Sequence, residues 1–210
     1  MMTTHTQLNN VQKASSEDTN YSVMNALSVS VRFTMVVFLL CGGVYTSIAT
    51  GLGSILFPHQ ASGSLLTVGS KTVGSELVSQ KFESSQYFHS RPSAAGYDPR
   101  GTVGSNLAPD NPELKTRVAS QVDIITQEYN IDSTVIPVDM VTTSGSGLDP
   151  HISPEAAYIQ AKRIAMERNI ELDRVKRLIT TMTEQPQWGV FGQERVNVLL
   201  LNIELDKIDN

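Results

Sequence analysis

The sequence predicts an α+β domain preceded by one transmembrane helix, and three observations carry this prediction. The first is a run of 25 residues, 33–57, without Asp, Glu, Lys, Arg or His. The second is a pair of helix-start signals in the second half of the chain, each a capping residue followed by proline and glutamate. The third is a set of short runs rich in Val, Ile and Leu, which favour strands. The 210 residues therefore divide into a tail, an anchor and one soluble domain.

Residues 1–30 are predicted to form a disordered N-terminal tail. Outside residues 23–29 they contain few apolar side chains, so they cannot bury enough apolar surface to offset the entropy lost on ordering. The charges of Lys13, Glu17 and Asp18, together with that of Arg32, sum to zero.

Residues 31–57 are predicted to form the transmembrane helix. As a helix the uncharged run would span roughly 37 Å, and a bilayer hydrocarbon core is ~30 Å thick. Its polar side chains are mainly hydroxyls, which can donate to helix carbonyls, and Pro58 is a plausible stop. Two alternatives are a buried core helix and a signal peptide cut after Ala49. The length disfavours the first, and the long, nearly uncharged leader disfavours the second.

Small residues give this helix a candidate packing face. Gly43, Ser47 and Gly51 recur every four residues, so they share one face and would allow another helix to approach closely. Ordinary glycine content of membrane helices explains them equally well. Arg32 flanks the N-terminal side directly, whereas the first positive residue after the segment is Lys71. This bias favours a cytoplasmic N-terminus and an extracytoplasmic domain.

Residues 58–210 form the predicted soluble domain, and its helices are indicated by their start signals. This part carries the whole net charge of −5 and is long enough for its own core. Asn-Pro-Glu at 111–113 and Ser-Pro-Glu at 153–155 each predict a helix N-terminus. A third apolar periodicity covers residues 172–182. The first helix shows the spacing most clearly, with apolar residues at Leu114, Val118, Val122, Ile125 and Tyr129.

Strands are predicted at residues 64–68, 76–82, 136–141 and 195–205. The first two are short pieces in a stretch rich in Gly, Ser and Pro. The last is the strongest strand prediction because it is dense in Val, Leu and Ile. Mixed helices and strands without an internal repeat give the α+β class.

Composition excludes several functional classes. Sixteen Lys+Arg against 21 Asp+Glu, with a pI near 5.3, give no basic footprint for nucleic acid. The single cysteine, Cys41, rules out an intramolecular disulfide and a Cys-based zinc cluster. The four histidines show no metal-ligand spacing, so no metal site is predicted. A phosphate loop is also rejected, because five residues separate Gly63 from Gly69 and Ser70 precedes Lys71.

Residues 142–154 are the densest polar segment, and they link a predicted strand to a helix N-terminus. Ser146, Asp149 and His151 are the residue types of a serine hydrolase. However, the Gly-x-Ser-x-Gly elbow is missing, and Asp149 and His151 are too close in sequence to imply triad geometry. A structured turn with a helix cap is the alternative. Residues 87–94, with two aromatic residues and an arginine, indicate a docking loop or a loop anchored by its aromatic side chains.

Four segments in order resemble the C-subunit family of the Kdp potassium-transporting ATPases. They are residues 87–94, Gly-Ser-Asn-Leu at 104–107, Ser-Gly-Ser-Gly-Leu-Asp-Pro-His-Ile-Ser-Pro at 144–154, and 194–202. The resemblance covers roughly residues 30–206 and includes the single N-terminal membrane helix. Its motif residues are candidates for partner contact or a structural role: Tyr87, Phe88, Arg91, Ser144, Gly145, Ser146, Gly147, Asp149, His151 and Asn197.

The resemblance implies an accessory, non-catalytic subunit of a bacterial high-affinity potassium pump in the inner membrane. The implied partners are a channel-like potassium-binding subunit, a P-type ATPase subunit and a small single-helix subunit, together with membrane lipid. The family role is to stabilise assembly and, as a catalytic chaperone, to raise the ATP affinity of the ATPase subunit. This chain lacks the Asp-Lys-Thr-Gly phosphorylation motif, so ATP and potassium would be handled by the complex. A membrane-anchored hydrolase and a secreted binding protein are the alternatives.

Overall fold

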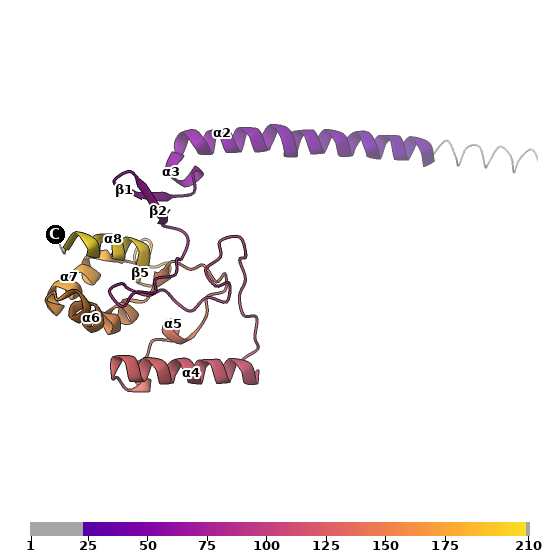
Figure 1. Ribbon diagram of the computed structural model, residues 1–210. Helices are drawn as coiled ribbons and strands as arrows, with labels where there is room; N and C mark the ends of the chain where they lie inside the picture. Colours follow the sequence, from indigo (N-terminus) through magenta and orange to yellow (C-terminus); the bar gives the residue numbers. More distant parts are fainter. Residues whose placement is uncertain (1–22, 209–210) are drawn as a thin grey trace, which may run out of the picture. The chain divides into compact units, whose positions relative to one another are not determined.

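The computed structural model describes residues 23–208 and divides into two units, Met1–Ser62 and Gly63–Asn210 (Figure 1). The prediction for residues 1–22 lies outside the described residues. Residues 23–30 are helical, which corrects the predicted extent of the tail. The physical reason is that their apolar side chains continue the helix that follows, and no Gly or Pro interrupts the chain up to residue 37.

The first unit is dominated by one long apolar helix, Val23–Leu56. It is α-helical to residue 37, π-helical in η1 (Phe38–Tyr45), and α-helical again in α2 (Thr46–Leu56). At 34 residues it is about 50 Å long. Among the described residues, no part of the most apolar 18-residue stretch of this helix is buried, which contradicts the core-helix alternative. By length and composition it is the single candidate membrane span among residues 23–208.

Hydroxyl groups in this helix donate to its own carbonyls, as the sequence predicts for a membrane segment. Ser30 Oγ donates to the carbonyl of Ala26 and Ser54 Oγ to that of Thr50, each at 2.9 Å. Thr46 Oγ1 reaches back five residues to Cys41, in keeping with the wider π-helical turn. The helix ends at Leu56, and after the capping residue Phe57 the short helix α3 (Pro58–Ala61) follows.

The second unit begins with a two-stranded antiparallel sheet, β1 (Leu65–Val68) and β2 (Lys71–Ser75). The predicted strand at 64–68 is confirmed. The predicted strand at 76–82 is wrong, because pairing stops at Ser75 and the next residues form turn and coil. Two of their polar groups bond elsewhere: Ser79 N–H donates to the Leu148 carbonyl, and Gln80 Nε2 donates to the Val73 carbonyl.

The predicted helix starts at 111–113 and 153–155 are confirmed. In α4 (Pro112–Tyr129) the Asn111 side chain accepts from the Glu113 N–H. In α6 (Pro154–Arg168) Ser153 Oγ accepts from the Ala156 N–H. The third predicted helix is α7 (Leu172–Met182). Local capping chemistry therefore located α4 and α6 correctly, and apolar periodicity located α7.

Of the two remaining strand predictions, that at 136–141 is wrong and that at 195–205 is correct only at its first three residues, and both segments are mainly helical. Residues 136–141 contain α5 (Val138–Val141), after the short 3-10 helix η2 (Ser133–Val135). Residues 195–205 form only a three-residue strand, β5 (Arg195–Asn197), before α8 (Val198–Ile208). The switch occurs at Asn197, whose Oδ1 accepts from the Leu200 N–H at 3.1 Å and so satisfies a free amide of the first helical turn.

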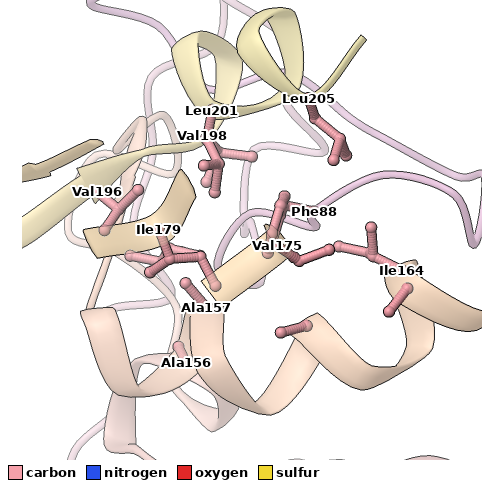
Figure 2. Packing of buried hydrophobic residues seen from close by; sticks show 13 residues of the cluster. Phe88, Ala156, Ala157, Ile164, Val175, Ile179, Val196, Val198, Leu201 and Leu205 are labelled. Atoms are coloured by element: carbon pink, nitrogen blue, oxygen red, sulfur yellow. The ribbon is translucent and has the colours of Figure 1, made fainter. Parts of the chain in front are cut away.

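The core is formed by α6, α7 and α8 packed against a small antiparallel sheet of order β3-β5-β4, where β3 is His151–Ile152 and β4 is Thr183–Glu184. Figure 2 shows these apolar side chains, with Phe88, which comes from a loop, among them. The fully buried members are Phe88, Ala156, Ala157, Ala161, Ile164, Val175, Ile179, Val196, Leu201 and Leu205. The mixed helix and sheet domain confirms the α+β class.

Candidate functional site

The loop around Phe88 is anchored by a buried asparagine. Phe88 N–H donates to Asn202 Oδ1 at 2.9 Å, and Asn202 Nδ2 donates back to the Phe88 carbonyl at 3.0 Å. Both residues are almost fully buried. The side-chain amide of Asn202, on α8, thus satisfies the backbone N–H and carbonyl of Phe88, whose ring lies in the core. In this loop the side-chain amide takes the place of the backbone partners that a neighbouring strand would supply.

Helix α6 fixes the neighbouring residues of the same loop. Gln160 Oε1 accepts from the His89 N–H at 2.7 Å, and Gln160 Nε2 donates to the His89 carbonyl at 3.2 Å. The guanidinium of Arg163 donates to the carbonyls of Ser85 and Tyr87. The backbone groups of this loop are therefore bonded mainly by side chains of helices, and not by the backbone of a neighbouring strand.

Tyr87 itself lies against charged side chains of α6 and α8. The guanidinium of Arg168 lies over its ring, 4.6 Å from the centroid, and pairs with Asp206 at 2.7 Å. The Tyr87 hydroxyl donates to Asp206 at 3.2 Å. These contacts give Tyr87 a structural role within the chain.

Arg91 joins the two segments that the sequence singled out. Its Nη1 donates to Asp149 Oδ2 at 3.0 Å, and its Nη2 donates to Thr142 Oγ1 at 3.3 Å. Both ion-pair partners are partly buried, with side chains 23% and 31% exposed, so the pair is less screened than a surface pair. Asp149 Oδ1 accepts from the His151 backbone N–H at 3.0 Å and lies 3.5 Å from His151 Nδ1.

Burial is the largest single influence on Asp149 and would raise its pKa. The hydrogen bonds from His151 and the positive charge of Arg91 outweigh it, so the pKa of the carboxyl is lowered. Asp149 is thereby held as an anion between its two partners. This arrangement suits a structural ion pair, and a proton donor would need the opposite shift.

The Ser144–Gly147 stretch is a tight turn packed on two other loops. Ser93 Oγ donates to the Gly147 carbonyl at 2.6 Å, and Val103 N–H donates to the Ser146 carbonyl at 3.0 Å. Gly147 has a φ of +71°, and a Cβ there would lie 2.6 Å from the Val103 carbonyl oxygen. Glycine is therefore required at this position on grounds of both conformation and space.

The other residues of the turn differ in exposure. Ser144 is buried, and its carbonyl accepts from the Gly147 N–H at 3.3 Å. Gly145 is exposed, but its carbonyl oxygen would lie 2.6 Å from a Cβ added at Gly104. The segment 104–107 thus touches the turn, which brings a further motif of the predicted set into the cluster.

Asn197 completes the cluster from the sheet. It is the cross-strand partner of His151 in the β3·β5 pairing. Its Nδ2 donates to the Glu76 carbonyl at 2.7 Å while its Oδ1 caps α8. All ten predicted motif residues therefore lie in one connected region of the second unit, and most of their polar groups bond to one another or to nearby backbone.

The predicted helix-packing residues lie in the first unit. Gly43, Ser47 and Gly51 are all exposed, and a Cβ added at either glycine would meet no atom of residues 23–208 within 4 Å. Among the described residues, therefore, no close contact explains the two glycines.

A groove of about 750 Å³ runs beside the cluster. Arg91, Asp149 and His151 line it together with the first turn of α6 and the start of β5. Asp139, placed by the helix α5, accepts from both the N–H and the Oγ of Ser153. That carboxylate lies at the N-terminus of α6, where the helix dipole favours a negative charge.

The geometry gives the cluster a scaffolding character. Ser146 Oγ accepts from the Leu148 N–H, and among the described residues no hydrogen bond joins it to His151. This arrangement does not assemble the nucleophile and base of the hydrolase alternative. Within residues 23–208 no group of three His, Cys, Asp or Glu side chains is placed to hold a metal ion.

Sequence reasoning missed the side chains that anchor the loop. Gln160, Arg163 and Asn202 contribute most of its hydrogen bonds, yet none was among the predicted site residues. One signal was present for Gln160, a polar residue within the apolar face formed by Ala157, Ala161 and Ile164. Its burial is consistent with a partner supplied by tertiary structure.

Comparison with known proteins identifies one family. The family model described as "K+-transporting ATPase, c chain" matches residues 27–207. The potassium-transporting ATPase KdpC subunit of Shewanella putrefaciens is 47% identical over 180 residues, covering 86% of this chain and 90% of that protein. The KdpC subunits of Geobacter metallireducens and Acidobacterium capsulatum are 43% and 45% identical, covering 88% of this chain and 99% and 100% of theirs.

Proposed function

We propose a role for this chain from one premise: it belongs to the KdpC family of potassium-transporting ATPase subunits. It is an accessory, non-catalytic subunit of that complex. The observation that carries this conclusion is the family match over residues 27–207, which includes most of the apolar helix and nearly all of the domain. The resemblance predicted from the sequence motifs is confirmed.

The first proposed task is assembly. The apolar helix anchors the chain in the membrane, and Gly43, Ser47 and Gly51 allow a helix of a partner subunit to approach closely. The domain presents loops that are fixed by Arg91–Asp149 and by the Asn202 amide, so they lose little entropy on binding. The proposed partners are the channel-like potassium-binding subunit, the P-type ATPase subunit and the small single-helix subunit.

The second proposed task is to raise the ATP affinity of the ATPase subunit, as a catalytic chaperone. In our proposal the N-terminus is cytoplasmic and the domain is extracytoplasmic, supported by Arg32 directly before the uncharged run 33–57 and by Lys71 as the first positive residue after it. A domain on that side cannot contact cytoplasmic ATP. The effect on ATP affinity is then a coupling free energy transmitted through the assembled complex.

Assembly and ATP coupling are tested together in the intact complex. The complex is purified through a tag on the ATPase subunit, with and without this chain, and ATP-dependent hydrolysis is measured. We expect this chain to co-purify and its omission to raise the ATP concentration needed for half-maximal hydrolysis. A complex that assembles and binds ATP equally well without the chain would refute the proposal.

Topology is tested by cysteine labelling in intact cells. A cysteine replaces Ser120, an exposed residue of α4, in a Cys41→Ser background, so that it is the only thiol. We expect a membrane-impermeant maleimide to label it from outside. Permeabilised cells serve as the control for reactivity. Labelling only after permeabilisation would place the domain in the cytoplasm and make direct nucleotide contact the better hypothesis.

A further inference from the structure

The hairpin between β4 and β5 ends in an exposed aromatic tip, defined as residues 187–191. The strands pair Glu184 with Arg195, and residues 185–193 between them carry no charge. Trp188 is 83% exposed, Val190 76% and Phe191 62%. Three neighbouring apolar side chains left in solvent on a hairpin indicate an interaction surface.

The aromatic tip is well ordered by its own hydrogen bonds. Gln187 and Phe191 exchange two backbone hydrogen bonds, at 2.8 and 3.0 Å, and Gly189 N–H donates to the Pro186 carbonyl at 2.8 Å. The rings of Trp188 and Phe191 pack edge to face with centroids 5.9 Å apart. A rigid aromatic pair loses little conformational entropy on binding, which is typical of interface anchors.

Trp188 occupies a backbone conformation that disfavours it. Trp188 and Gly189 have consecutive positive φ values, 56° and 73°, as at the centre of a type I′ turn. Asn followed by Gly is the favoured pair there, because asparagine tolerates the left-handed region. The backbone conformation of this turn therefore carries a cost for the large ring, and among the described residues the ring has one aromatic contact, with Phe191, while remaining 83% exposed.

Charge favours a protein partner over a lipid surface. Peripheral membrane-binding elements place Lys or Arg beside their aromatic residues, to approach anionic headgroups. Here Arg195 is paired with Glu184 at 2.9 Å, and Glu194 has no ion pair among the described residues. Residues 58–210 also carry the entire net charge of −5. The carboxylate of Glu194, beside the aromatic tip, is therefore complementary to positive charge around a binding pocket on a partner protein.

We propose that the aromatic tip docks into an apolar, basic-rimmed pocket on another subunit of the potassium-transporting ATPase complex, with Trp188 as the anchor. This inference rests on the proposed assembly function and specifies its contact. The pocket receives the rings of Trp188 and Phe191, and its rim pairs with Glu194. A second copy of this chain and the lipid bilayer are the competing occupants.

The first experiment measures retention of this chain in the complex purified through a tag on the ATPase subunit. Trp188→Asn removes the ring and suits the turn, so we expect an unchanged thermal unfolding midpoint in detergent but about tenfold or greater loss of retention. Trp188→Phe should restore part of it. Met166→Ala, which trims a side chain that is 73% exposed on α6, is the matched control and should retain normally.

The second experiment places a benzophenone amino acid at position 188 of the full chain and identifies what it crosslinks in native membranes. A crosslink to another subunit supports the proposal, whereas a crosslink to lipid alone or to a second copy overturns it. Normal retention of Trp188→Asn also overturns it, and the assembly function then stands. If the unmodified chain itself fails to co-purify, the proposed function and this inference both fail.

Discussion

The buried amide of Asn202 is expected to be a principal support of the loop that contains Phe88. Asn202→Leu removes the acceptor for the Phe88 N–H and the donor to its carbonyl, while keeping the number and branching of the side-chain heavy atoms. Asn202 is 2% exposed and Phe88 is fully buried, so water cannot replace the lost partners without opening the core.

The magnitude follows from the two groups left unpaired. Each buried backbone group without a partner costs about 1–3 kcal/mol, which gives about 2–6 kcal/mol for the pair. An apolar side chain in place of a buried amide offsets roughly 1–2 kcal/mol of this. The centres of these two ranges give a net loss of about 2.5 kcal/mol in the free energy of unfolding, and with an m-value near 2 kcal/mol/M this lowers the urea midpoint by roughly 1 M.

The assay is urea unfolding of the full chain in detergent, followed by far-ultraviolet circular dichroism. Gln127→Leu, a similar change at an exposed position of α4, is the matched control and should change stability by no more than about 0.5 kcal/mol. If Asn202→Leu unfolds at the same urea concentration as the control, the argument that this amide supports the loop is wrong.

Three further predictions concern other residues. Gly147→Ala should lower stability by at least about 1–2 kcal/mol in the same assay, because alanine disfavours a φ of +71° and its Cβ would meet the Val103 carbonyl; an unchanged midpoint would contradict this. Burial lowers the pKa of His89 below 6.5, although a hydrogen bond to the Ser84 carbonyl opposes the shift. The stability that comes from keeping His89 neutral is therefore complete above pH ~6.5, the unfolded-state pKa, and is lost as the pH falls toward the folded-state pKa. His89→Gln should therefore weaken the loss of stability between pH 7.5 and 5.5, and an equal loss in both proteins would argue against burial as the cause. Gly51→Leu should reduce retention of the chain in the purified complex without altering its unfolding, because a Cβ at this exposed position meets no atom of the described residues within 4 Å; normal retention would count against the packing face.

Local signals predicted the helices well. Asn111 and Ser153 cap α4 and α6 through their side chains, and capping depends only on residues within one turn. The strand predictions fared worse where apolar residues were continuous. Residues 198–201 read Val-Leu-Leu-Leu, and without alternating polar residues this run does not distinguish a strand from a buried helix.

The candidate site was predicted as a set of motif residues without its connections. Arg91 and Asp149 were both selected from the sequence, but they are 58 residues apart, and only the fold shows that they form an ion pair. The roles of Ser146 and His151 also changed, because their bonds hold a turn and a carboxylate in place. The same residue types would have suited a hydrolase, so geometry was needed to choose.

The sequence by itself determined the apolar span, the capped helices and the family motifs, because each depends on composition or on neighbours within a few residues. Tertiary structure alone decided how the loop at Phe88 is held, since Asn202 and Gln160 reach it from 114 and 71 residues away. The physical reason is that a buried backbone group must find a hydrogen-bond partner, and the fold determines which distant side chain supplies it.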